Sequence, residues 1–284
     1  MDTLAIAVLV VILVSIGISA LRKISFCMLT IVACAIVMGM EVASDSIDSI
    51  VFAPGRLLDP NMAYTVLTSM YAHDRWTLNH LLLNMIGLAF IGIVLEQRIG
   101  TRPFILLYLL SGFFGTLVFA GSYWNDPYVG VIGASGAVSG VLGGFARLYP
   151  NERMAFIILP AYPMKIWTIV VLFVGLQFLT FVFYSGIAWQ AHLGGLVAGI
   201  LVAPLVVKIR VKGPTRGAVP AAALRKLAVT PELRDMLRHV EQESVPDVRN
   251  AWIEHFMAKA RCPICGSPIK VSGEAVRCSK GHLL

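Results

Sequence analysis

Two side chains in the apolar part of the chain could together perform nucleophilic chemistry. Ser135 lies in a Gly-Ala-Ser-Gly sequence, and His192 lies in Ala-His-Leu-Gly-Gly. A serine hydroxyl is a weak nucleophile until a base takes its proton, and histidine often serves as that base. Small residues follow both at intervals of four, Gly136, Gly140 and Gly144 after the serine, and Gly195, Gly199 and Ala203 after the histidine. Such stripes let two helices pack closely, so a serine–histidine pair is geometrically plausible.

An oxyanion formed at the serine would need fixed hydrogen-bond donors. His80 and Asn84 are spaced i, i+4, so they share one face of a helix. Glycines before the serine, Gly133 among them, let the chain bend and place Ser135 near a helix N-terminus, where free N–H groups favour negative charge. Each feature also has an ordinary explanation: a helix–helix hydrogen bond for His80 and Asn84, a bond to its own backbone for the serine, and a structural role for the histidine.

Four residues between positions 262 and 282 have the types and spacing of a metal site. Cys262 and Cys265 form Cys-x2-Cys, and after twelve residues Cys278 and His282 form Cys-x3-His. Four such ligands suit tetrahedral zinc, and so small a unit would take its folding energy from the metal. Free thiols are the alternative. Because four protein ligands leave no open position, we expect structural zinc and no cofactor for catalysis. The cysteine pattern is unlike a secreted disulfide framework.

The composition indicates which elements hold these residues. Of the 284 residues, 57% are hydrophobic and 14% are charged, and the mean hydropathy is +0.79. Because a soluble domain carries about a quarter charged residues, the chain is predicted to be a polytopic membrane protein. Disorder and collagen-like repeats are excluded. The whole net charge of +7 lies beyond residue 207, where 14 basic residues face 7 acidic ones. A polar, basic tail therefore follows a membrane body.

A membrane-spanning helix needs roughly 20 mainly apolar residues. Seven segments qualify: 4–21, 25–41, 80–96, 103–123, 131–149, 165–184 and 187–207. The basic pair Arg22-Lys23 follows the first segment, whereas in a signal peptide it would precede it. Basic residues gather in the loops after the first, third, fifth and seventh spans, which places the N-terminus outside and the C-terminus in the cytoplasm. In the external loop 42–79, the apolar stretch from Tyr64 to Tyr71 is predicted to lie in the membrane interface.

Beyond the last span the signals are those of a soluble segment. Thr230 and Pro231 are typical of a helix start, predicting a helix to about Glu243, and Pro246 opens another. Residues 269–271 and 275–277 are predicted to pair as short strands. The expected domains are an extra N-terminal transmembrane helix (1–24), a membrane core (25–207), a cytoplasmic helical linker (208–258) and a zinc-ribbon-like module (259–284).

The ordered set of membrane motifs resembles the rhomboid family of intramembrane serine proteases over roughly residues 25–207. The residues that carry the resemblance are His80-x-x-x-Asn84, Gly133-x-Ser135-Gly136, and His192 with Gly195 and Gly199, supported by Glu96, Gly100 and Tyr108. Each motif alone is weak, but the ordered set is specific. The resemblance implies an all-α polytopic membrane protein: a six-helix rhomboid-like bundle, here with one extra N-terminal transmembrane helix, a small cytoplasmic helical segment and a zinc ribbon.

The resemblance also implies roles for individual residues. Ser135 would be the nucleophile and His192 the general base, while His80 and Asn84 would line the oxyanion site. Gly133 would shape the loop, and Gly136 and Gly195 would permit close helix contact. The reaction would be peptide-bond hydrolysis through an acyl-enzyme, with transmembrane helices in the lipid bilayer as substrates, cut near a small residue.

Besides the extra N-terminal span 4–21, this chain departs from the family pattern at two positions. Ser139 stands where some members carry an aromatic residue that supports the histidine ring. Arg75-Trp76 reverses the order found in many members, so no role is carried over to it.

Two other function classes compete with the protease. A non-catalytic rhomboid-like protein would bind membrane clients, although such relatives usually lack the serine or the histidine. A transporter would use the same polar residues as a pathway, but the sequence has no inverted repeat. The basic tail is explained by membrane topology and anionic lipid. For the zinc module we favour a cytoplasmic protein partner over nucleic acid. The location expected is a prokaryotic cell membrane.

Overall fold

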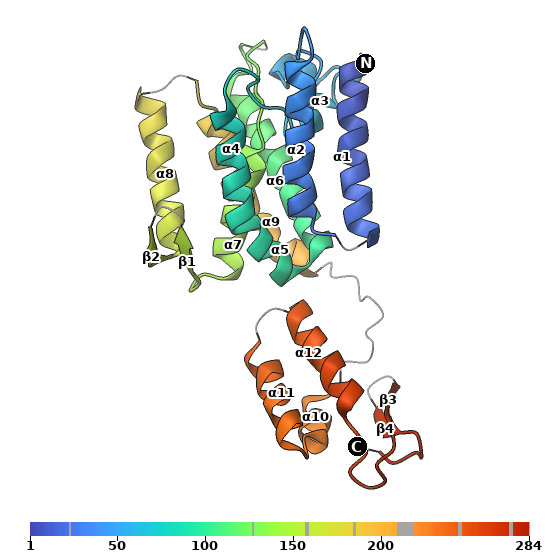
Figure 1. Cartoon of the computed structure of the whole chain (residues 1–284). Helices are drawn as coiled ribbons and strands as arrows, with labels where there is room; N and C mark the ends of the chain where they lie inside the picture. The colour runs from blue at the N-terminus through green and yellow to red at the C-terminus, as the bar shows by residue number, and fades with distance from the viewer. Residues whose placement is uncertain are drawn as a thin grey trace. The chain divides into compact units, whose positions relative to one another are not determined.

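The computed structural model describes residues 1–22, 24–126, 128–156, 159–183, 186–208, 219–243, 246–272 and 275–283. The chain forms two compact units, Met1–Ile209 and Arg210–Leu284, which are taken here one at a time (Figure 1). Lys23, used above to orient the chain, and residues 273–274, expected to turn between two strands, lie outside the described residues.

The first unit is a bundle of apolar helices (Figure 1). These are α1 (Thr3–Arg22), α2 (Phe26–Val42), the continuous segment α4 (Leu78–Gly87), η2 (Leu88–Gly92) and α5 (Ile93–Ile99), α6 (Thr101–Ser122), α7 (Ser135–Leu148), α8 (Ile166–Phe183) and α9 (Trp189–Lys208). Within the described residues, α1, the α4–η2–α5 segment, α6, α8 and α9 are long and apolar enough to cross a membrane, and α2 is a shorter apolar helix. The predicted all-α, polytopic fold is confirmed, and the chain is an integral multi-pass membrane protein.

Helix α7 is shorter than the predicted span 131–149. It begins at Ser135, because Val131 instead pairs with Phe52 through backbone hydrogen bonds of 2.7 and 3.2 Å. Gly133 then donates its N–H to the carbonyl of Ser69 over 2.8 Å. Fourteen residues of helix rise about 21 Å, less than the roughly 30 Å of a hydrocarbon core. The serine therefore stands at the start of a short helix, after an extended and anchored loop.

Helices α6, α7 and α9 pack backbone against backbone. A side-chain carbon at Gly195 would overlap the carbonyl oxygen of Gly136, and one at Gly199 would overlap that of Gly140. On α6, a carbon at Gly115 would lie 2.6 Å from the carbonyl oxygen of Ala191. The two stripes of small residues thus face each other, as the spacing predicts. This contact brings the first turns of α7 and α9 together.

The segment from Leu78 to Ile99 contains the π-helical turn η2 and ends at a buried carboxylate. Glu96 is 4% exposed and accepts hydrogen bonds from Ser25 Oγ (2.6 Å) and from the N–H groups of Phe26 (2.7 Å) and Cys27 (2.9 Å). It therefore caps the N-terminus of α2, where negative charge is favourable. Gly100 follows with φ +87°, a conformation that glycine adopts without strain, and reverses the chain into α6.

The loop between α2 and α4 packs into the bundle. It contains a short 3-10 helix, η1 (Pro54–Arg56), and one helical turn, α3 (Thr65–Thr68). Met70 and Tyr71 are buried, and Thr68 Oγ1 donates to the carbonyl of Ile50 over 3.0 Å. Of the apolar stretch predicted to lie in the membrane interface, Met70 and Tyr71 belong to the protein core, whereas Tyr64 and Leu67 are half-buried.

A β-hairpin that the sequence did not predict joins α7 to α8. Strands β1 (Arg153–Phe156) and β2 (Leu159–Lys165) pair antiparallel, with Arg153 opposite Lys165. Helix α8 follows directly from β2.

The second unit combines three helices with a small sheet. The elements are α10 (Ala221–Leu227), α11 (Pro231–Gln242), α12 (Pro246–Lys259) and the antiparallel strands β3 (Ile269–Ser272) and β4 (Ala275–Cys278). Thr230 accepts a hydrogen bond from the N–H of Leu233 over 3.2 Å, which confirms the predicted helix cap. Phe256 of α12 and Val276 of β4 belong to one buried cluster with Leu233. The hairpin therefore packs on the helices.

Candidate active site and metal centre

Ser135 and His192 meet at the contact between α7 and α9. The distance from Ser135 Oγ to His192 Nε2 is 2.7 Å, a hydrogen bond between residues 57 positions apart. Ser135 is the first residue of α7, and His192 lies on the first turn of α9. The glycine contacts between these two helices hold the pair in place. A hydroxyl hydrogen-bonded to a neutral imidazole can lose its proton to that ring as it attacks an electrophile.

The other ring nitrogen of His192 contacts a residue that the sequence analysis did not single out. His192 Nδ1 lies 2.7 Å from Gln177 Oε1 on α8. Phe173, one turn earlier on α8, has its ring centroid 6.3 Å from that of the imidazole. The sequence could have pointed to Gln177, because it is the only residue with an amide side chain in the predicted span 165–184.

Ser139 does not take the place of the aromatic residue found there in some family members. Its Oγ donates to the carbonyl oxygen of Ser135 over 2.6 Å, a bond back to its own helix. Among the described residues, the imidazole of His192 has Ser135 and Gln177 as its hydrogen-bond partners.

His80 lies beside the loop that leads into Ser135. Gly133 has φ +119°, and a side-chain carbon there would be 2.6 Å from His80 Nε2 and 3.6 Å from Ser135 Oγ. Only glycine fits this position, because both the backbone angle and the histidine exclude a side chain. The structure thus brings together Gly133, His80 and Ser135.

Asn84, predicted to line the oxyanion site, forms a hydrogen bond within its own helix. The side chain is buried, and its Nδ2 donates to the carbonyl of His80 over 2.8 Å, within the same helix. One amide N–H is therefore engaged, which leaves the second for another acceptor.

A small cavity of about 20 Å³ lies next to the serine. Its lining includes Met70, Gly112, Thr116, Gly133, Ser135 and Ala191. This volume is about enough for one water molecule. Only a small group could enter it without movement of the surrounding helices.

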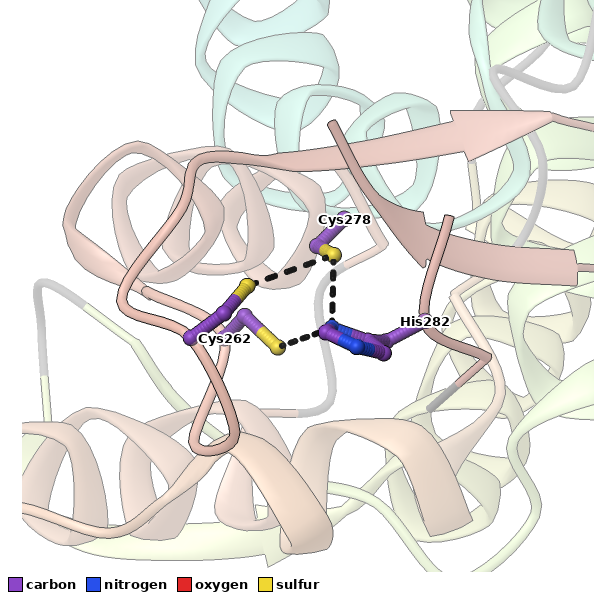
Figure 2. Close-up of side chains that lie close together, drawn as sticks. Cys262, Cys278 and His282 are labelled. Carbon is purple, nitrogen blue, oxygen red and sulfur yellow. Dashed lines mark hydrogen bonds between the residues drawn. The ribbon is translucent and has the colours of Figure 1, made fainter. Parts of the chain in front are cut away.

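The four predicted metal ligands come together in the second unit. The ligand atoms of Cys262, Cys265, Cys278 and His282 all lie within 4.8 Å of one another. Figure 2 labels three of the four residues, Cys262, Cys278 and His282. Cys278 Sγ lies 3.4 Å from His282 Nδ1, and Cys262 Sγ lies 3.7 Å from the same nitrogen. The sulfurs of Cys265 and Cys278 are 3.7 Å apart. Four ligands at a tetrahedral zinc, with Zn–S of about 2.3 Å, place two sulfurs about 3.8 Å apart, so the cluster could hold a metal ion.

The backbone around Cys265 is shaped for this cluster. Gly266 (φ +68°) donates to the carbonyl of Cys262 over 2.8 Å, and Cys262 donates to that of Ser267 over 2.9 Å. Hydrogen bonds from the side chain and backbone of Ser267 lower the pKa of the Cys265 thiol to about 6. The thiolate is the form that binds metal, so this environment favours binding.

Comparisons with known proteins agree with the membrane site. The model of the rhomboid domain matches residues 60–209, which contain Ser135, His192, His80 and Asn84 but not the metal cluster. Rhomboid-like protease 3 of Toxoplasma gondii is 33% identical over 48% of this chain and 49% of its own length. RHOMBOID-like protein 4 of Arabidopsis thaliana is 40% identical over 43% of this chain and 29% of its own.

A shorter bacterial relative is covered more fully. The putative rhomboid protease YdcA of Bacillus subtilis is 33% identical over 51% of this chain and 68% of its own length. The chain spans about half of the Toxoplasma protein and less than a third of the Arabidopsis protein. The match over residues 60–209, together with the helical bundle that holds these motifs, shows that the chain belongs to the rhomboid family.

Proposed function

We propose that this chain is an intramembrane serine protease that uses Ser135 and His192 as a catalytic dyad. The observation that carries the proposal is the hydrogen bond of 2.7 Å between Ser135 Oγ and His192 Nε2. The proposal is supported by the chain's membership of the rhomboid family and by the names of two relatives, which call them proteases.

The dyad would act in two stages. Ser135 Oγ attacks the carbonyl carbon of a peptide bond while its proton passes to His192 Nε2. When the tetrahedral intermediate collapses, the C–N bond breaks, the leaving nitrogen takes the proton from Nε2, and an acyl ester stays on Ser135. A water molecule then gives a proton to the same Nε2 as its oxygen attacks the ester carbon. The bond from this carbon to Ser135 Oγ breaks, and Oγ takes the proton back from Nε2, which frees the serine.

The oxyanion would form between the serine and the preceding loop. The N–H of Ser135, the first in α7, lies before the hydrogen-bonded turns of the helix and is available to an anion. His80 beside Gly133 would supply a side-chain donor. Asn84 would line this site with the amide N–H that His80's carbonyl does not use. Gly136 and Gly195 would keep the two helices close enough for the dyad.

The substrates would be transmembrane segments of other proteins in the bilayer. The cavity of about 20 Å³ beside Ser135 favours a small side chain next to the cleaved bond. A peptide reaches this site only in extended form, because a helical backbone keeps its carbonyls in internal hydrogen bonds.

The remaining assignments follow from charge and ligand chemistry. We place the N-terminus outside and the cytoplasmic face at the basic loops, in a prokaryotic cell membrane. We assign structural zinc to Cys262, Cys265, Cys278 and His282, with a cytoplasmic protein as the partner of that module. The proposed domains are 1–24, 25–207, 208–258 and 259–284.

Labelling with a fluorophosphonate probe tests the dyad directly. The full chain in detergent would be compared with Ser135→Ala and His192→Ala, and both variants should lose labelling. Ser139→Ala is the matched control, since this serine lies one turn further along α7 and bonds only to its own helix. It should label like the wild type.

Cleavage of a transmembrane substrate in liposomes provides the second test. Wild-type protein and Ser139→Ala should cleave it, whereas Ser135→Ala should not. Cleavage or labelling that persists in a folded Ser135→Ala variant would refute the proposed nucleophile.

A further inference from the structure

A catalytic histidine needs a hydrogen-bond partner at each of its two ring nitrogens. When Nε2 accepts the serine proton, the neutral ring must carry its own proton on Nδ1. In water an imidazole exchanges freely between the two tautomers, so a fixed acceptor at Nδ1 selects the reactive one. In His192 the atom that faces Nδ1 is Gln177 Oε1, at 2.7 Å.

Gln177 lies on α8, whose other residues are apolar apart from Trp167 and two threonines. Of the residues of α8, only Ile166, Ile169, Val170 and Gln177 are buried, and the first three lie on its first two turns. Gln177 is 4% exposed. An amide placed in an apolar membrane environment costs free energy unless it is hydrogen-bonded, so its burial implies a partner. The partner on this face is His192.

Helix α8 contacts the imidazole at two points. Phe173 and Gln177 are spaced i, i+4 and share one helix face. The phenyl ring lies 6.3 Å from the imidazole centroid at an interplanar angle of 42°, while the amide oxygen of Gln177 lies 2.7 Å from Nδ1. Ser139, on the opposite helix α7, is engaged with the carbonyl of Ser135. The orientation of the ring therefore depends on α8.

We propose that Gln177 is the positioning residue of the dyad: it fixes the Nδ1–H tautomer of His192 and holds the imidazolium during proton transfer. This inference rests on the proposed function. When the proton of Ser135 reaches Nε2, the positive ring keeps its Nδ1–H on the amide oxygen. Because this acceptor is neutral, its stabilisation of the cation is smaller than that of a carboxylate.

The kinetic test compares three variants of the full chain on one transmembrane substrate. Gln177→Met keeps the length of the side chain but removes the oxygen, and kcat should fall about 10- to 100-fold with KM nearly unchanged. Gln177→Glu restores an oxygen and should recover much of that loss. It should also move the acidic limb of the rate profile to higher pH, because a carboxylate favours the imidazolium.

Thr180→Val is the matched control on the same helix. Its hydroxyl bonds to the backbone carbonyl of Gln177 rather than to the histidine, so its kcat should stay at the wild-type value. Equal kcat in Gln177→Met and the wild type, or equal losses and identical pH profiles in the Met and Glu variants, would overturn the inference.

A spectroscopic test needs no turnover and separates the two proposals. In 15N spectra of protein labelled at histidine, His192 of Ser135→Ala should keep the Nδ1–H tautomer, and Gln177→Met should shift it toward Nε2–H. An unchanged tautomer in Gln177→Met overturns the positioning role even if the dyad is active. Probe labelling that persists in Ser135→Ala would instead count against the proposed function alone.

Discussion

The serine site and the metal cluster are built in opposite ways. Ser135 and His192 are 57 positions apart, on two helices whose backbones touch, and they meet without any ion. The four metal ligands fall within 21 consecutive positions, on turns and the end of one strand. The membrane site is held by packing, whereas the cluster is held by local turns and whatever binds between its ligands. A site of the first kind is preorganised, and a site of the second kind would be completed by a metal ion that it binds.

Removal of the metal should produce the largest effect, and it should be confined to the second unit. Structural zinc contributes about 10–16 kcal/mol of apparent binding free energy in small modules. We expect one zinc per chain by mass spectrometry in the wild type and none in Cys278→Ser, with faster proteolysis of residues 262–283. Fluorophosphonate labelling of Ser135 should not change.

The buried thiol of Cys34, in α2, gives the control for this experiment. Cys34→Ser should retain the zinc, since Cys34 is not a member of the cluster. If Ser135 labelling fell together with the metal content of Cys278→Ser, the independence of the two regions would be disproved.

The hydrophobic core of the second unit should matter next. Phe256 is fully buried among the residues that support β4, and Phe256→Ala should cost about 3–5 kcal/mol. Hydrogen exchange should become faster in α11 and α12 and stay unchanged in α7 and α9. Val229→Ala, at a half-exposed position, should leave all four helices as they were. Unchanged exchange in Phe256→Ala would mean that the metal alone organises this unit.

The addition of a single methyl group to α9 would test whether helix packing holds the membrane site. Gly195→Ala forces a carbon onto the carbonyl oxygen of Gly136 and should separate α7 from α9, at a cost of about 1–3 kcal/mol. Substrate cleavage should fall at least about tenfold, because the dyad needs its short distance. Gly39→Ala on α2 meets no atom within 4 Å and is the control. Wild-type cleavage by Gly195→Ala would show that packing does not set the geometry.

The smallest effect concerns an ion pair next to the end of α7. Arg98 Nη1 lies 2.7 Å from Glu152 Oε2, and this hydrogen bond lowers the pKa of the Glu152 carboxyl. Such a group stabilises the fold above its unfolded pKa of about 4.3, and the gain is lost as the pH falls through the lower folded value. Because Glu152 is 35% exposed, Glu152→Gln should cost less than about 1 kcal/mol at pH 7.

Thermal unfolding at pH 7 and at pH 3 would measure this contribution. The difference between the wild type and Glu152→Gln should shrink at the lower pH. A difference that grows at pH 3 would contradict the sign given above.

The helices and the metal ligands were predictable from sequence because their signals are local. Apolar length indicated the membrane helices, the Thr230–Pro231 pair marked the start of α11, and Cys and His spacing identified the cluster. The start of α7 was missed by four residues, because Val131 pairs with Phe52 about 80 positions away. Apolar content also cannot separate lipid-facing from buried residues, so Met70 and Tyr71 were assigned to the interface.

Side-chain partners between helices were the hardest part to predict. To predict that Gln177 contacts His192, one would have to know which face of α8 meets α9. The sequence of α8 is too uniformly apolar to show a preferred face. For Asn84 the sequence pattern was visible, but it did not distinguish between two arrangements. Its spacing from His80 is compatible both with a shared site and with a bond inside one helix, and the structure contains the second.

The π-helical turn at Leu88–Gly92 has a consequence for how this chain is aligned with other sequences. Such a turn accommodates one inserted residue, which in a regular α-helix would rotate everything beyond it by about 100°. His80 and Glu96 therefore keep the directions that they would have in a regular helix with one residue fewer between them. A relative with one residue fewer in this segment should have a straight helix, with the counterparts of His80 and Glu96 facing the same partners. An alignment that closes the gap elsewhere would match side chains that point in different directions.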